Sequence, residues 1–133
     1  MQKARTGGPM DLKEYFENTE GFGVLTTADG EGNVNSAVYA RPHAMEDGSL
    51  AFVMRDRRSY KNLESNPNAT YLFKADGPGY KGKRLYLNKI REEENSPLID
   101  SLSRRPCPVV TNKEESKFLV YFKLERERPL IGG

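Results

Sequence analysis

Residues 36–67 read SAVYARPHAMEDGSLAFVMRDRRSYKNLESNP, and this stretch decides the fold. Two largely apolar segments flank a turn at residues 46–48, a basic cluster follows, and a short helix should end at Pro67. The second segment, residues 50–54, is apolar at every position. This pattern predicts a strand that is covered on both faces.

The first of the two segments is predicted to be one strand from residue 34 to residue 45. Because successive side chains of a strand point to opposite faces, it should present two different surfaces. One carries Val34, Val38 and Ala44, and the other carries Tyr39, Arg41 and His43. A charged strand residue directly before a proline is unusual, so Arg41 is a candidate binding residue, with an exposed polar face as the alternative. We interpret His43 as structural rather than as a catalytic base.

The basic cluster follows the buried strand and precedes a helix predicted over residues 59–65. Ser59 is a good helix N-cap. Free backbone N–H groups at a helix N-terminus attract anions, and guanidinium groups bind phosphate in a fork. The cluster consists of Arg55, Arg57, Arg58 and Lys61. The sequence therefore predicts the site of a phosphorylated cofactor, and the alternative is a solvated run of charge.

The rest of the chain predicts further short strands and two more helices. Residues 91–94 are interpreted as a solvated strand end, and Ser96 as the cap of the last helix. Residues 1–9 are expected to be a flexible lead-in, and residues 10–133 a single domain. The expected helix at 11–18 precedes strands at 22–27, 69–75, 84–88 and 118–124. Six strands in mostly hairpin order predict a mainly β protein, a small antiparallel barrel with a few short helices.

Composition excludes several classes of function. The 133 residues carry 21 basic and 19 acidic side chains, a net charge of +2, which does not indicate a nucleic-acid-binding protein. One cysteine, Cys107, and one histidine exclude an internal disulfide and an ordinary zinc site. No apolar run reaches membrane-spanning length and no secretion leader is recognisable, so we expect no membrane and a cytoplasmic protein. Neither a catalytic dyad nor a glycine-rich nucleotide fingerprint appears, which suits a protein whose cofactor carries the chemistry.

Several segments together resemble a known family. They are SAVYARPH (36–43), GSLAFVMRDRRSYKNLESNP (48–67), ATYLF (69–73), KGKRLYL (81–87) and the closing VYFKLERERPLIGG (120–133). Their order is similar to that of the pyridoxamine 5′-phosphate oxidase-like split barrels that bind FMN, over roughly residues 10–130. The resemblance implies a six-stranded antiparallel split β-barrel. It also implies a homodimer with one flavin in each of two grooves between the subunits.

The resemblance further implies which residues bind the flavin. The strand matching residues 39–42 would lie against the ring and the ribityl chain, the strand matching residues 52–54 would back the ring, and basic and hydroxyl residues would hold the phosphate. The implied FMN-binding residues are Tyr39, Ala40, Arg41, Pro42, Phe52, Val53, Met54, Arg57, Arg58, Ser59 and Lys61. The family's oxidase has a further C-terminal segment for pyridoxal phosphate that this sequence does not show, so oxidation of vitamin B6 is not implied.

The leading functional hypothesis is an FMN-binding flavoprotein that acts as a small oxidoreductase or flavin reductase. Two alternatives stay open at the level of sequence. One is a non-catalytic protein that holds flavin or haem as a sensor or carrier, and the other is a deazaflavin-dependent reductase. The sequence identifies no catalytic residue, substrate or electron donor.

Overall fold

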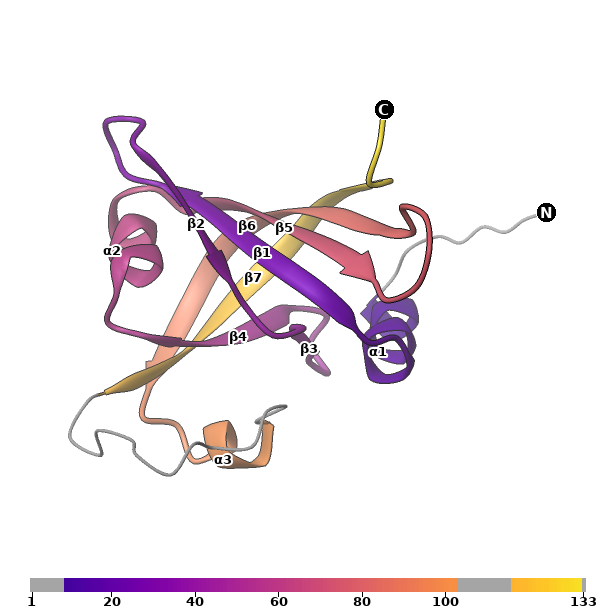
Figure 1. The fold of residues 1–133 in the computed structure, drawn as a ribbon. Helices are drawn as coiled ribbons and strands as arrows, with labels where there is room; N and C mark the ends of the chain where they lie inside the picture. The colour runs from indigo at the N-terminus through magenta and orange to yellow at the C-terminus, as the bar shows by residue number, and fades with distance from the viewer. Residues whose placement is uncertain (1–8, 103–115, 133) are drawn as a thin grey trace, which may run out of the picture.

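The structure, a computed structural model, describes residues 9–102 and 116–132. Its elements in chain order are α1 (Pro9–Asn18), β1 (Gly21–Ala28), β2 (Val34–Val38), β3 (His43–Ala44), β4 (Leu50–Arg55), α2 (Arg58–Ser65), β5 (Asn68–Ala75), β6 (Gly82–Glu94), α3 (Leu98–Leu102) and β7 (Lys117–Arg128). The strands form one curled antiparallel sheet in the order β2-β1-β5-β6-β7-β4-β3 (Figure 1). The mainly β antiparallel barrel is confirmed, with seven strands in the described residues rather than six.

The additional strand arises because the strand predicted over residues 34–45 is interrupted. β2 pairs with β1, whereas β3 pairs with β4 at the other edge of the sheet. Residues 39–42, called here the bridge segment, therefore cross between the two edges and mark the split of the barrel. Pro42 has no N–H to donate to a ladder, which favours a break at this point. Because of the break, Val34 and Val38 are exposed while Ala44 packs against the core, so their predicted common face is wrong.

β4 is the strand that the core closes around. Its alternate side chains Phe52 and Met54 belong to the main core, which fills the barrel. Ala51 on the opposite face belongs to a second apolar cluster, against which Val53 packs. The second cluster also contains Ile99 of α3, Leu119 and Tyr121. The prediction that this strand is covered on both faces is confirmed, and a continuously apolar strand is the expected consequence.

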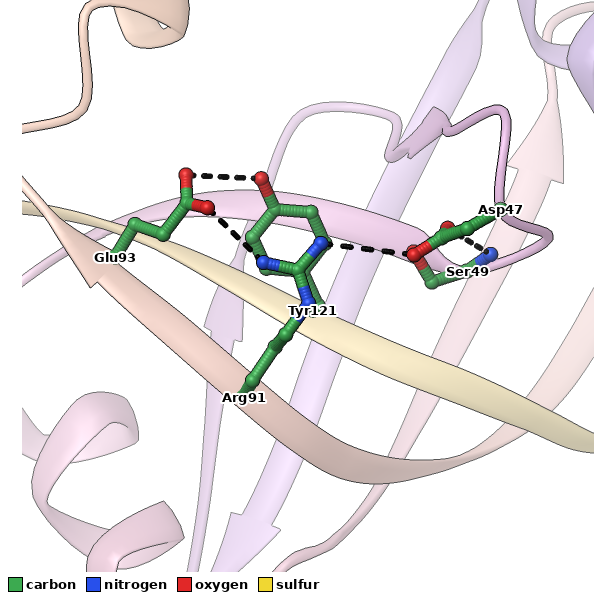
Figure 2. Close-up of polar contacts among 5 residues, drawn as sticks. All are labelled: Asp47, Ser49, Arg91, Glu93 and Tyr121. Carbon is green, nitrogen blue, oxygen red and sulfur yellow. Dashed lines mark hydrogen bonds and ion pairs between the residues drawn. The ribbon is translucent and has the colours of Figure 1, made fainter.

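Residues 91–94 form the end of β6, where they are exposed or half-buried and still pair with β7. Figure 2 shows the polar contacts of two of them, Arg91 and Glu93. The Arg91 guanidinium lies 3.6 Å from the centre of the Tyr121 ring, and its Nη1 lies 3.0 Å from Glu93 Oε2. The Tyr121 hydroxyl donates to Glu93 Oε1 at 3.0 Å, and Arg91 Nη2 lies 3.5 Å from Asp47 Oδ2. The network ties the turn before β4 to β6 and β7.

The helices close the ends and flanks of the barrel, with α1 and α2 on opposite sides (Figure 1). In α1, Phe16 is buried and packs edge-on against Phe73 at 5.2 Å between ring centres. Ser96 caps α3 as predicted, because its Oγ accepts the Leu98 N–H at 3.2 Å. Cys107 lies outside the described residues. No helix of the described ranges is long and apolar enough to span a membrane.

Candidate functional site

The bridge segment is held in place by its main chain. The Tyr39 N–H donates to the Gly23 carbonyl at 3.0 Å, and the Tyr39 carbonyl accepts the Tyr71 hydroxyl at 2.9 Å. Glycine is required at position 23, because a Cβ there would lie 1.9 Å from the Tyr71 hydroxyl oxygen. The Tyr39 ring packs edge-on against Phe52, with 6.0 Å between ring centres. The first residue of the predicted flavin-binding strand is thus fixed from β1, β4 and β5.

Arg41 is directed to α1. Its Nη1 donates to the Phe16 carbonyl at 2.6 Å and to the Thr19 carbonyl at 2.7 Å. The last carbonyls of a helix have no intrahelical partner, and a cation next to them is also favoured by the helix dipole. Arg41 therefore has a structural role at the C-terminal end of α1 that its sequence context did not indicate. Its contact with a flavin stays a prediction.

The other predicted residues of the bridge segment and of β4 divide by exposure. Ala40 is exposed, whereas Pro42 is buried. Phe52 and Met54 are each 1% exposed and face the core. Val53 faces the second apolar cluster. Within the single chain, the side chains at positions 52 and 54 can therefore support a ligand only from behind, through the backbone of β4.

The N-terminus of α2 differs from the prediction by one residue. The helix begins at Arg58 with Arg57 as its N-cap, so the assignment of Ser59 as N-cap is wrong. The helix starts earlier because the Arg57 carbonyl already accepts the Lys61 N–H at 3.0 Å, which is the first helical hydrogen bond. Ser59 is 3% exposed and faces inward, where its hydroxyl lies next to the Tyr39 side chain and 3.5 Å from Asn35 Nδ2. Ser59 joins α2 to the bridge segment and to β2.

Burial raises the pKa of the Tyr39 phenol. Desolvation disfavours the charged phenolate, so Tyr39 keeps its proton through the physiological range. The phenol can therefore act as a hydrogen-bond donor at the junction of α2 and the bridge segment.

The three basic residues predicted to hold phosphate surround the first turn of α2. Arg57, Arg58 and Lys61 are all exposed. Lys61 Nζ lies 3.2 Å from Asp56 Oδ1, an exposed ion pair that partly compensates its charge. The first N–H groups of a helix have no intrahelical partner and attract anions. The structure thus places a positive surface at the N-terminus of α2, next to the bridge segment.

A cavity of about 270 Å³ opens between α2 and the turn that joins β1 to β2, and we call it the α2 cavity. Of the predicted residues it contains only Arg58. The lining is Asp29, Asn33, Val34, Asn35, Arg58 and Asn62. Asn62 is 3% exposed, and its Nδ2 donates to Thr27 Oγ1 at 3.0 Å, so a buried polar contact supports the cavity floor.

The sequence analysis did not assign the three asparagines to the site. Asn33 and Asn35 are far from Asn62 in the chain, because the bridge segment, β3 and β4 lie between them. The available signal was a polar residue three positions after Ser59 on the inner side of the helix. A larger depression of about 590 Å³ runs along the C-terminal half of β7 and contains none of the predicted site residues. In the described ranges no three His, Cys, Asp or Glu side chains come together as a metal site.

Comparison with known proteins places the fold in a defined class. No family model and no curated protein matches the sequence. An FMN-binding protein from Syntrophomonas wolfei has a similar structure, with a TM-score of 0.71, 18% identity, and coverage of 94% of this chain and 90% of that one. An F420 reductase matches with a TM-score of 0.66, 12% identity and coverage of 94% and 98%. The haem storage protein HutZ from Vibrio cholerae matches with a TM-score of 0.55, 17% identity and coverage of 90% and 92%.

The chain therefore has the split-barrel fold of FMN-binding and pyridoxamine 5′-phosphate oxidase-like proteins. The resemblance stated from the sequence is confirmed at the level of the fold. The three similar proteins are named for three different ligands. The fold by itself therefore does not select among flavin, deazaflavin and haem.

Proposed function

We propose that this protein is an FMN-binding flavoprotein that acts as a small oxidoreductase or flavin reductase. The observation that carries the proposal is the meeting of three features where the barrel is split. These are the basic first turn of α2, the bridge segment and the α2 cavity. The likeness to an FMN-binding protein over most of both chains supports the same ligand.

The residues present fit a phosphorylated flavin. Arg57, Arg58 and the α2 N–H groups supply donors for a phosphate, and the carboxamides of the α2 cavity can bond hydroxyl groups. Tyr39, next to Ser59 of α2, supplies a further protonated phenol. When bound, FMN would supply hydride or single-electron chemistry, and the chain would bind and orient it and limit its contact with water.

The proposal includes a homodimer with the flavin between subunits. The outer face of β2, β1 and β5 carries several exposed apolar side chains in the single chain, together with the hydrogen-bonded Thr26 and Ser36. Val38, Val24 and Leu72 stand in one row across the three strands, since Val24 pairs with both of the others. Phe22 is 55% exposed and Val34 74% exposed on the same face. Contiguous exposed apolar surface typically marks an interaction site. Val34 also lines the α2 cavity, so a second copy on this face would border the proposed ligand site.

The first test identifies the ligand that copurifies with the protein by its mass and absorption spectrum. FMN is expected. Turnover of a reduced nicotinamide with an electron acceptor then separates an enzyme from a carrier. A bound haem would exclude the flavin proposal, and a bound deazaflavin would favour the second candidate, a deazaflavin-dependent reductase, which the likeness to an F420 reductase supports.

The second test locates the phosphate. The ligand-free protein is titrated with FMN and with riboflavin, which lacks only the phosphate. Two or three charge-assisted contacts should favour FMN by about 3–5 kcal/mol, on the order of a hundred- to several-thousand-fold in Kd. Arg58→Ala should remove about 1.5–3 kcal/mol of FMN binding and leave riboflavin unchanged. The matched control is Lys123→Ala, an exposed cation on β7. Equal losses in the two variants would remove Arg58 from the site.

A further inference from the structure

The α2 cavity contains one charge of each sign. Asp29 lies at the end of β1 and Arg58 at the start of α2, and both line the cavity. Both residues belong to the described part of the chain, and no ion pair joins them. The rest of the lining is neutral. It consists of three asparagine carboxamides and Val34. The wall is therefore not the all-donor surface that suits a doubly charged phosphate.

The Asp29 carboxylate is held rigidly by its own turn. Its Oδ1 accepts the Glu31 and Asn33 N–H groups, each at 2.9 Å, and its Oδ2 accepts Asn33 Nδ2 at 3.0 Å. A carboxylate offers about four acceptor sites, so most of its hydrogen-bonding capacity is used within the turn. These bonds, that of the Asn33 side chain first, lower the pKa of Asp29, which is therefore ionised at neutral pH. What remains for a ligand is mainly a fixed negative charge.

We propose that Asp29 determines the ligand specificity of the α2 cavity by opposing a doubly charged phosphate beside Arg58. The carboxamides of the cavity then suit the hydroxylated chain of the ligand, and the phosphate beside Arg58 is bound less tightly than it would be without Asp29. The inference rests on the proposed function, because it places the phosphate end of the flavin at Arg58. Its consequence is that the native FMN affinity lies below what the basic residues alone would give.

The test removes the charge and keeps the turn. In Asp29→Asn, Oδ1 can still accept the two backbone N–H groups, and Asp29→Ser offers a hydroxyl for the same purpose. FMN should bind roughly three- to tenfold more tightly to both variants, because a nearby like charge is removed at a partly screened site. Riboflavin affinity should be unchanged, which also shows that the variants are folded.

The matched control is Asp47→Asn. Like Asp29, Asp47 accepts the N–H two residues ahead, that of Ser49 at 3.0 Å, but it lies in the turn before β4 and does not line the α2 cavity. This variant removes the same charge from the chain, so equal FMN tightening in Asp47→Asn and Asp29→Asn would overturn the proposal. So would an unchanged or weaker FMN affinity in both Asp29 variants.

Inorganic phosphate provides a readout that does not depend on flavin. The side-chain amide NMR signals of Asn35 and Asn62 should shift at lower phosphate concentration in Asp29→Asn than in the wild type. If the protein binds flavin but neither FMN affinity nor the phosphate titration differs between wild type and Asp29→Asn, the inference is overturned and the proposed function stands. A phosphate difference without flavin binding supports the role of Asp29 and overturns the proposed function.

Discussion

Arg41→Ala should destabilise the fold. Arg41 joins the bridge segment to the C-terminal end of α1 through charged hydrogen bonds, and the substitution removes them. One guanidinium nitrogen serves two carbonyls, those of Phe16 and Thr19, at 2.6 and 2.7 Å. A hydrogen bond to a charged group contributes about 1.5–3 kcal/mol, and water can partly replace the donor at this half-buried position. Two bonds that share a nitrogen give an expected loss of about 2–4 kcal/mol. For a chain of this size, about 3 kcal/mol lowers Tm by about 10 °C.

The assay is urea unfolding followed by far-UV circular dichroism. The midpoint should fall by about 1–2 M with an unchanged slope, since the loss concerns stability and not the extent of unfolding. Arg58→Ala is the control, because Arg58 is exposed on the first turn of α2 and should change stability by less than about 0.5 kcal/mol. A change of this small size for Arg41→Ala would refute the structural role. If FMN affinity then fell with stability intact, Arg41 would act as a ligand-binding residue.

Two further predictions concern assembly and acid stability. The wild type should sediment as a dimer at micromolar concentration, and Val38→Arg should be monomeric. The control Ile90→Arg, at a 50% exposed site on β6, should stay dimeric. A wild-type mass of one chain would contradict the prediction. Hydrogen bonds from Ser49, its side chain first, hold the pKa of Asp47 below its ordinary 3.8. The folded pKa is thus the lower one, so this stabilisation is complete above the unfolded pKa of about 3.9 and is lost as the pH falls through the folded value. The difference in unfolding free energy between wild type and Asp47→Asn should therefore be constant from pH 7 to about pH 5 and shrink below about pH 4. A difference that grows on acidification would refute it.

Short-range patterns in the sequence determined several helices and strands of this protein. The continuous apolar run at residues 50–54 predicted a strand covered on both faces, and the two clusters around β4 confirm it. Asn66 and Pro67 predicted the end of α2, which stops at Ser65. In β5 apolar residues alternate along the sequence, and Ala69, Tyr71 and Phe73 are the buried ones. These features depend on side chains a few positions apart, so the sequence contains them in readable form.

The tertiary structure alone decided how the strands close and which side chains meet. Pro42 favours a break within residues 34–45, but the crossing from one edge of the sheet to the other depends on partners in β1 and β4. Arg41 contacts α1 for the same reason, and Ser59 turns inward to Tyr39 and Asn35. The α2 cavity unites Asp29, which follows β1, with Arg58 and Asn62 of α2. Such contacts join residues far apart in the chain, and short-range periodicity carries no information about them.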